Sequence, residues 1–333
     1  MSLIDIVRKK KRLMAAPLVG YPGAMLTGTG VIDNLQKAEV QAGSMIALYE
    51  RYGFDVIFNF MDLSVEAEAL GLAVEFHDEG APDVREHPIS NSERLAGLRV
   101  PDPLQDGRMP VFADAIRLAK EHIDTLVAGY VTSPFTLSGL LMGAENLAIG
   151  TLMDPALSKA CLQFTADCVI PYALAQQQAG ADMVVLLDPT AVLLSPRLYD
   201  EFAKPYIEQV SNALDIPVVL HICGQTTPLM PNLVSTHVAG LSLDSEVDLA
   251  EIMPQIPEDM VVLGNIPPVS TMLYGNVEQV KDEVDSLMDD LHQYPNFIIS
   301  TGCDLPLLTP LDNLNVFASE VFAGLEESRD ETR

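Results

Sequence analysis

The sequence predicts an α/β protein, a parallel (β/α)8 TIM barrel with an excursion after its second strand. Eight short apolar runs recur along the chain, and several are near-continuous Val, Ile and Leu, which is typical of parallel strands buried on both faces. Stretches with helical spacing separate these runs, and 333 residues suffice for one such barrel, which commonly takes roughly 250 residues. A doubly wound sheet is the alternative, but no Gly-x-Gly-x-x-Gly motif follows the first run.

The expected elements follow from these runs in chain order. The expected strands are 17–21, 54–58, 125–130, 183–187, 217–221, 240–243, 260–264 and 297–300. Helical spacing is clearest over 155–178, 196–214 and 277–293. The interval 61–124 is rich in proline and charge, which favours an elaborated segment over the barrel mouth rather than a second domain. We therefore expect residues 1–333 to form a single barrel domain.

Composition and charge narrow the class of protein. Lys and Arg total 19 against 47 Asp and Glu, so the formal net charge is −28, and neither nucleic acid nor a membrane surface is an expected partner. With 48% hydrophobic residues the chain can bury enough apolar surface to fold, which excludes a disordered protein. No run reaches the ~18 apolar residues of a membrane span. Four cysteines in a chain of this size indicate reduced thiols, so we expect a cytoplasmic protein.

Three residues have the types and positions of a metal site. His221 and Cys223 lie two apart at the end of the run 217–221, so their side chains point to one side of the strand, above Val219. Cys303 follows the last run, also at a carboxyl end, where barrel enzymes place their chemistry. Two thiolates and an imidazole leave the fourth position of Zn²⁺ open, which is the catalytic arrangement. The alternative is two buried cysteines and a core histidine.

The pattern His221-x-Cys223, followed much later by Cys303, resembles the zinc signature of the methylcobamide:coenzyme M methyltransferases. These belong to the uroporphyrinogen decarboxylase superfamily of (β/α)8 barrels. Further stretches similar to that family are Leu220-His-Ile-Cys-Gly224, Leu263-Gly-Asn-Ile266, Thr309-Pro-Leu-Asp-Asn313, Ala179-Gly-Ala-Asp182 and Leu194-Ser-Pro196 with Phe202. The resemblance implies a zinc-dependent methyltransferase that moves a methyl group from a methylated corrinoid (cobalamin), carried by a partner protein, to a thiol such as coenzyme M.

Uroporphyrinogen decarboxylase and a corrinoid methyltransferase with tetrahydrofolate as acceptor are the alternatives, together with a noncatalytic zinc barrel that only docks a corrinoid protein. Uroporphyrinogen carries many carboxylates, so its enzyme requires cationic side chains over the barrel mouth, which the family places after the first strand. Residues 13–36 contain no Arg, Lys or His, which argues against the decarboxylase. Their glycine-rich stretch, with Gly28 and Gly30, would instead let a flat corrinoid cofactor approach the backbone closely.

Two residues at the ends of other strands are expected to support the reaction. Asp188 ends the run before that of His221, so its carboxylate is expected to hydrogen-bond the second imidazole nitrogen. Capping of the turn at Pro189 is the alternative for Asp188. Asn265 ends the seventh run and is expected to orient the substrate, unless it serves the turn instead.

A fourth metal ligand is expected after the sixth strand. In the methyltransferases that the chain resembles, a glutamate near this point is a ligand that yields to the incoming thiol. The matching residue here is Asp244, one methylene shorter, with Glu246 close behind it. The resemblance therefore implies Asp244, Glu246 or a water as the fourth ligand, and capping of the next helix is the alternative for Asp244.

Overall fold

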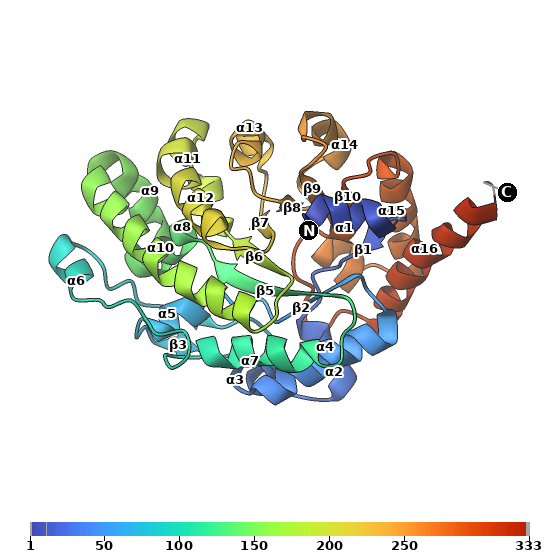
Figure 1. The fold of residues 1–333 in the computed structure, drawn as a ribbon, viewed down its shortest axis with the longest axis horizontal. Helices are drawn as coiled ribbons and strands as arrows, with labels where there is room; N and C mark the ends of the chain where they lie inside the picture. The colour runs from blue at the N-terminus through green and yellow to red at the C-terminus, as the bar shows by residue number, and fades with distance from the viewer. Residues whose placement is uncertain (1, 11, 331–333) are drawn as a thin grey trace.

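The computed structural model describes residues 2–10 and 12–330, with side chains up to residue 323. Eight parallel strands form one sheet in the order β1-β10-β9-β8-β7-β6-β5-β2, and Figure 1 shows the helices arranged around it. The strands are β1 (Met14–Ala15), β2 (Val56–Phe58), β5 (Leu126–Thr132), β6 (Met183–Leu187), β7 (Val218–Ile222), β8 (Gly240–Leu243), β9 (Val261–Ile266) and β10 (Phe297–Thr301). The predicted barrel is confirmed, and the doubly wound sheet is excluded.

The barrel closes where its first two strands meet. Asp55, just before β2, donates its N–H to the carbonyl oxygen of Ala15 at 2.8 Å, and its carboxylate accepts the N–H of Ala15 at 2.9 Å. The same carboxylate pairs with Arg12 at 2.6 Å and with Lys10 at 2.8 Å. Two cations and a backbone amide thereby offset the large desolvation cost of a buried charge at this seam.

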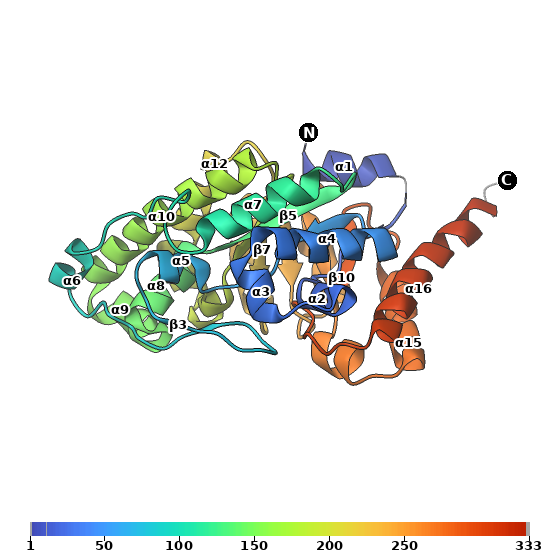
Figure 2. The same cartoon turned by 90° about the horizontal axis from the view of Figure 1, so that it is seen from below.

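Alternate residues of each strand point into the barrel or out toward the helices. Apolar side chains such as Val219 and Leu263 fill the interior. Helix α1 (Leu3–Lys10) covers the amino end of the barrel, where Leu3 and Val7 join this interior cluster. In Figure 2, α1 lies on the upper side of the molecule and α9 (Ala144–Met153) at its lower left. The amino end is therefore filled, and the carboxyl end is left for function.

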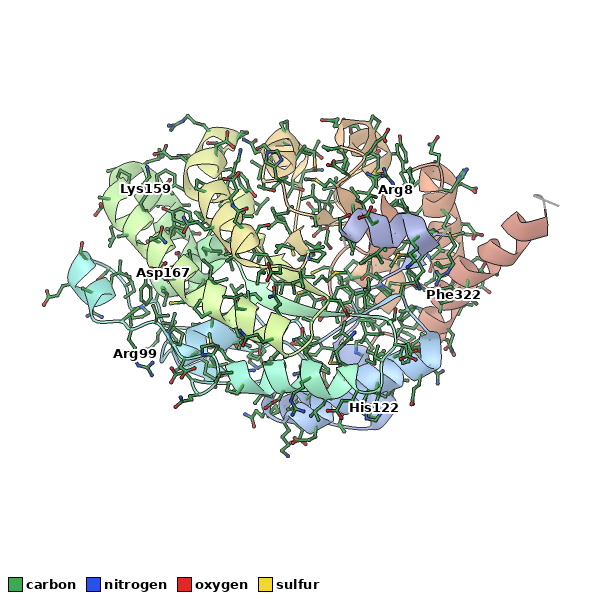
Figure 3. The ribbon with its side chains drawn as sticks, viewed as in Figure 1. Arg8, Arg99, His122, Lys159, Asp167 and Phe322 are labelled. Atoms are coloured by element: carbon green, nitrogen blue, oxygen red, sulfur yellow. The ribbon has the colours of Figure 1, made fainter. Side chains whose placement is uncertain are left out.

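The helices occupy the segments between strands. They are α2 (Tyr21–Thr27), α3 (Val31–Gln36), α4 (Ala38–Tyr52), α5 (Val65–Ala69), α6 (Ser92–Ala96), α7 (Met109–Lys120), α8 (Pro134–Met142), α9 (Ala144–Met153), α10 (Pro155–Gln178), α11 (Pro196–Phe202), α12 (Lys204–Ala213), α13 (Met230–Val234), α14 (Leu249–Ile252), α15 (Val277–Leu291) and α16 (Leu311–Asp330). Charged side chains such as Lys159 on α10 and Arg99 lie on the outer surface (Figure 3). Among the described helices, none is both long and apolar enough to cross a membrane.

Two elements differ clearly from the expected ones, whereas the ends of the others agree within two residues. The first strand is Met14–Ala15 rather than 17–21, because helix α2 takes up the chain from Tyr21. The helix expected over 196–214 is two helices, α11 and α12. Pro205 explains this break, since proline lacks an N–H and its ring clashes with a carbonyl of the preceding turn in a continuous helix.

The segment after β2 forms the expected excursion. It holds α5, α6 and a small antiparallel pair of strands, β3 (Val74–Glu75) and β4 (Asp83–Val84). Arg108 anchors this segment, because the residue is only 5% exposed and its guanidinium donates to Asp62 at 2.5 Å and to Glu68 at 2.6 Å. The last part of the range 61–124 is α7, which packs against α4 and β5 as one of the helices of the barrel.

Candidate metal centre

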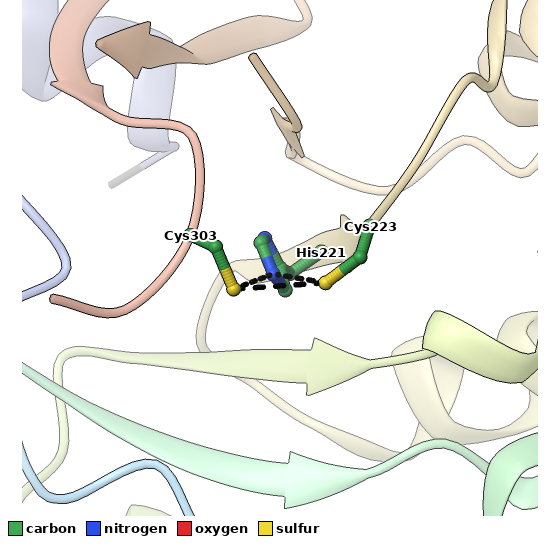
Figure 4. A group of neighbouring side chains, drawn as sticks. All are labelled: His221, Cys223 and Cys303. Atoms are coloured by element: carbon green, nitrogen blue, oxygen red, sulfur yellow. Dashed lines mark hydrogen bonds between the residues drawn. The ribbon is translucent and has the colours of Figure 1, made fainter. Parts of the chain in front are cut away.

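Three ligand atoms meet at the carboxyl end of the barrel. A ring nitrogen of His221 and the sulfurs of Cys223 and Cys303 all lie within 4.8 Å of one another. Nε2 of His221 is 3.3 Å from the sulfur of Cys223 and 3.6 Å from that of Cys303, and the two sulfurs are 3.6 Å apart. Figure 4 shows the three side chains converging from two chain segments. The structure thus brings together the three residues that the sequence spacing singled out.

Strand geometry explains this convergence. His221 lies in β7 and Cys223 directly follows that strand, while Cys303 follows β10, so all three are at carboxyl ends. The loop after β10 approaches the loop after β8 very closely at Gly302. A Cβ on Gly302 would lie 2.5 Å from the backbone nitrogen of Ser245, so only glycine fits there.

The second imidazole nitrogen has a partner that the sequence analysis missed. Nδ1 of His221 lies 3.0 Å from Oγ of Ser242, and both residues are buried. Ser242 is the in-register partner of His221 on β8, so the two side chains face the same side of the sheet. When the hydroxyl accepts from Nδ1–H, the lone pair of Nε2 faces the two sulfurs, as a metal ligand requires.

Asp188 does not make the hydrogen bond to the imidazole that was expected of it. The in-register partner of His221 on β6 is Leu187, so the next residue, Asp188, points the other way. Its carboxylate accepts from Oγ1 of Thr136 at 2.8 Å, and its side chain does not cap the turn that follows. Burial raises the pKa of Asp188 to about 7, opposed by hydrogen bonds from Thr136 and Ser133. A direct role of this carboxyl in the reaction stays a prediction.

Asp244 borders the three ligands without joining them. Its Oδ2 accepts the N–H of Gly224 at 2.8 Å, and its Oδ1 accepts the N–H of Glu246 at 3.0 Å. Both oxygens therefore hold the loops that follow β7 and β8. The side chain of Glu246 is exposed. The identity of a fourth ligand stays a prediction.

Asn265 fixes the same loop from the neighbouring strand. Its Nδ2 donates to the carbonyl oxygen of Asp244 at 2.8 Å and to that of Val247 at 2.7 Å. Both amide hydrogens are used in this way, so Asn265 serves the turn after β8. Orientation of a substrate by its remaining oxygen stays a prediction.

The two thiols of the centre differ electrostatically. A hydrogen bond with the thiol of Cys303 lowers the pKa of Cys223, while burial and the negative charge of Asp244 oppose that effect. The same bond, together with burial, raises the pKa of Cys303. The other two cysteines behave as packing residues, since burial raises the pKa of Cys161 to about 11 and that of Cys168 to about 12.

Gly28 and Gly30, predicted to contact a corrinoid, lie at helix ends. Most of the glycine-rich stretch is helix α2, which ends at Gly28 with φ 67°, and Gly30 precedes α3. The left-handed conformation of Gly28 is the usual way to end a helix. Contact of either glycine with a cofactor stays a prediction.

Further acidic residues at the mouth escaped the sequence analysis. Glu66 is buried and accepts the N–H of Thr132 at 2.6 Å and its hydroxyl at 2.9 Å. Burial raises the pKa of Glu66 to about 7, against these hydrogen bonds. Asp304, next to Cys303, accepts the N–H of Gly20 at 3.2 Å. Asp304 could have been found from the sequence, because it directly follows the predicted ligand Cys303. Glu66 could not, because it belongs to the excursion, whose fold no sequence motif indicates.

The donor set suits zinc. Two sulfurs and an imidazole nitrogen are ligands that Zn²⁺ prefers, and three protein ligands leave one position for a substrate. Cys223 and Cys303 are partly buried rather than fully enclosed. The hydroxyl of Ser242 supplies the outer hydrogen bond that orients a ligating imidazole.

Sequence comparisons identify a family and its branches. A sequence model described as Uroporphyrinogen decarboxylase (URO-D) matches residues 19–323. The chain is 29% identical to the Methylcobamide:CoM methyltransferase MtbA of Methanosarcina acetivorans, over 92% of this chain and 94% of the relative. It is 30% identical to the Methylated-thiol–coenzyme M methyltransferase of Methanosarcina mazei, over 86% of this chain and 76% of the relative. A uroporphyrinogen decarboxylase of Pseudoalteromonas atlantica is 25% identical, over 86% and 83%.

Solved structures support the same architecture. A methyltransferase from Methanosarcina mazei superposes with a TM-score of 0.89 over 97% of this chain and 98% of that chain, at 23% identity. A B12-independent methionine synthase from Shewanella superposes with a TM-score of 0.59 over 96% and 97%, at 13% identity. These likenesses confirm the barrel fold.

Proposed function

The chain belongs to the uroporphyrinogen decarboxylase family, and we propose that it is an enzyme of this family that transfers a methyl group from a methylated corrinoid to a small thiol. The observation that carries the proposal is the meeting of His221, Cys223 and Cys303 at the barrel mouth, with ligand atoms within 4.8 Å of one another. The names of two relatives specify coenzyme M as the acceptor, and one of them specifies a methylcobamide.

Each residue of the centre has a defined task in this proposal. His221 binds the metal through Nε2 while Ser242 holds Nδ1, and Cys223 and Cys303 bind through their sulfurs. A zinc ion held there supplies Lewis acidity, which keeps an alkyl thiol as its thiolate at neutral pH although the free thiol has a pKa near 8.5. Asp244, held by the N–H groups of Gly224 and Glu246, borders the three ligands.

The proposed reaction balances without a further reactant. The thiol gives its proton to solvent, and its sulfur attacks the methyl carbon in line with the cobalt–carbon bond. A carbon–sulfur bond forms while the cobalt–carbon bond breaks. The bonding electron pair stays on the corrinoid, which leaves in the cobalt(I) form, and the organic product is a methyl thioether.

Exposed apolar side chains favour docking of a corrinoid protein at the mouth. In the described part of the chain, each exposed large apolar residue lies in a segment that comes after a strand. Each one is located before the long helix that returns to the next strand, or at the first residue of that helix. They are Met25, Val100, Leu104, Ile149, Leu152, Met153, Val192, Leu193, Val269, Tyr274, Val277 and Leu308. Such segments gather at the carboxyl end of a barrel, and exposed apolar surface marks interaction sites. We therefore propose this end as the surface that receives the partner.

The alternatives have less support at the mouth. Decarboxylation of uroporphyrinogen needs free cations there, but residues 13–36 hold none, and the buried Arg108 is paired with Asp62 and Glu68. Tetrahydrofolate as the methyl acceptor requires a separate experiment. The cytoplasmic location stays a prediction that rests on the four free cysteines.

The proposal is tested by incubating the zinc-loaded protein with methylcobalamin and a small thiol and following the loss of methylcobalamin absorbance. We expect thioether formation that stops when a chelator removes the metal, and release of about one proton on thiol binding. Tetrahydrofolate and uroporphyrinogen are offered separately. Formation of methyltetrahydrofolate or of coproporphyrinogen, without any thioether, would replace the proposed function.

A further inference from the structure

We propose that the acceptor thiol of this protein is neutral or positively charged beyond its sulfur, and that a thiol carrying a sulfonate or carboxylate is disfavoured. This inference rests on the proposed methyl transfer and names the class of its acceptor. Two observations carry it. The segments that build the metal centre contain no Lys or Arg, and carboxyl groups of the chain occupy three backbone N–H groups at the mouth that could otherwise bind an anion.

Cationic side chains are missing from the sequence around the centre. Residues 205–280 and 282–328 contain no Lys or Arg, and these stretches hold β7 to β10 with the segments that follow them. The segments that follow β1 and β5 lack them as well, over 13–36 and 121–158. A sulfonate that reaches the metal centre therefore meets no Lys or Arg from any of these segments.

The cations that do follow strands are already engaged. Arg108 is the buried one, and its three nitrogens donate to Asp62 at 2.5 Å, to Glu68 at 2.6 Å and to Ser64 at 2.8 Å. Arg99 lies at the edge of the molecule in Figure 3, where Asp106 binds it through both carboxylate oxygens. The remaining contacts are Arg85 with Glu75, Arg197 with Glu201, Arg94 with the carbonyl of Pro88, His77 with Asp83, and His87 with the carbonyl of Leu140.

Some of the backbone N–H groups at the mouth, the usual non-cationic partners of an oxyanion, are also taken. Three of them at the mouth are bound by carboxyl oxygens of this chain. The pairs, with the N–H first, are Gly20 with Asp304 at 3.2 Å, Thr132 with Glu66 at 2.6 Å, and Gly224 with Asp244 at 2.8 Å. An anionic substrate group would have to displace one of these carboxyl groups.

The polar groups next to the ligands suit a hydrogen-bond donor rather than an anion. The carboxylate of Asp244 lies beside the loop that carries Cys223, where its Oδ2 accepts the N–H of Gly224 at 2.8 Å. The second oxygen of Asp304 is buried without a hydrogen-bond partner in the described residues. Two cysteine thiolates offset the charge of a zinc ion, so the centre offers no net positive charge to a distant anion. A hydroxyl or ammonium group finds acceptors here.

A matched series of thiols tests the inference. 2-Mercaptoethanol, cysteamine and 2-mercaptoethanesulfonate (coenzyme M) share one spacer and differ only in the distal group. With methylcobalamin as donor, we expect kcat/KM for the sulfonate to be about tenfold below that for the alcohol, and calorimetric binding to weaken in the same order. The deficit should shrink between about 0.05 M and about 0.5 M salt, because salt screens repulsion. Equal or better use of the sulfonate overturns the inference, whereas failure of all three thiols rejects the proposed function itself.

A charge added at the mouth gives an independent check. Val192 is 37% exposed and its Cγ2 lies 3.6 Å from where a Cβ on Gly224 would sit, so it faces the loop after Cys223. In Val192→Lys we expect the ratio of kcat/KM for the sulfonate to that for the alcohol to rise severalfold, and in the uncharged control Val192→Met to stay unchanged. If this ratio of kcat/KM values is the same in the two variants and the unmodified protein, charge is not the basis on which the protein selects its thiol.

Discussion

Ser242 and His221 form the contact that orients the metal centre: Oγ of the serine lies 3.0 Å from Nδ1 of the imidazole, on adjacent strands. The hydroxyl fixes the ring while Nε2 faces the sulfurs of Cys223 and Cys303 at 3.3 and 3.6 Å. The serine is neutral, so it fixes the ring without adding a negative charge to those of the two cysteine thiolates. A carboxylate in its place, such as that of Asp188, would have added one.

Replacement of Ser242 by alanine should weaken zinc binding. The change removes the partner of Nδ1 while leaving all three ligands, and loss of such an outer hydrogen bond costs about 10- to 100-fold in metal affinity. Competition with a chromogenic chelator measures the change. Ser300→Ala is the matched control, because that hydroxyl is also buried in the barrel but donates to the carbonyl of Ala16 at 2.7 Å. Equal zinc affinity in both variants would show that Ser242 does not support the ligand.

The two classes of cysteine should respond differently to substitution. Cys223→Ser and Cys303→Ser each remove a thiolate ligand, so zinc content should fall from about one ion per chain to a small fraction of it. Cys161→Ser, in the core, should keep its zinc. Affinity should also fall as the pH is lowered, because the ligands must lose protons to bind. Metal analysis after dialysis gives the answer, and similar zinc content in all three variants would refute the ligand assignment.

Asp244→Asn should keep most of its zinc yet change the thiol dependence of the rate. Three strong ligands remain, but an amide offers only one oxygen to the two N–H groups, of Gly224 and Glu246, that the carboxylate now accepts. We expect KM for the thiol to change severalfold. Glu246→Gln is the control, since that side chain is exposed. Thiol kinetics that match the unmodified protein would remove Asp244 from the site.

Glu66 should make the protein less stable as the pH rises. The pKa of this carboxyl is raised from 4.5 to about 7, so between these values the folded state binds more protons than the unfolded state. The free energy of unfolding contributed by Glu66 therefore falls as the pH rises through this window. Glu66→Gln can still accept the N–H of Thr132, and it should gain roughly 1 to 3 kcal/mol relative to the unmodified protein between pH 5 and 8.

Urea unfolding of the two proteins at several pH values measures this difference. The comparison cancels the titration of every other group, provided that the substitution leaves their surroundings intact. A constant difference in the free energy of unfolding over the whole range would mean that Glu66 stays ionised in the folded protein.

The meeting of the three candidate ligands could be predicted from sequence because it depends on strand parity and on chain order. His221 and Cys223 share a face of β7 whatever the neighbouring strands do, and Cys303 lies at a carboxyl end by chain order. The range of α10, expected over 155–178, also matched, because Asp154 caps it and a long helical repeat follows. Local pattern was sufficient for each of these.

The partner of the imidazole depended on register, which the sequence does not show. Strands β6 and β8 both flank β7, and the expected partner was Asp188 at the end of β6. Register places Leu187 opposite His221 on that side and Ser242 opposite it on the other. Asp188 is one residue beyond this partner, so its carboxyl points to the other side of the sheet and accepts from Thr136. The alternation of Gly240, Ser242 and Asp244 along β8 was the signal that would have found the serine.

The separation of the two sulfurs along the chain determines when the centre can assemble. Cys223 and Cys303 are 80 positions apart, and Cys303 follows the last strand, which pairs with both β9 and β1. A growing chain therefore lacks one of the three candidate ligands until β10 has joined the sheet. In the proposed zinc form, the bound ion would favour the closed barrel over any form in which this terminal strand has detached. Removal of the metal should therefore weaken the attachment of β10 to its neighbours.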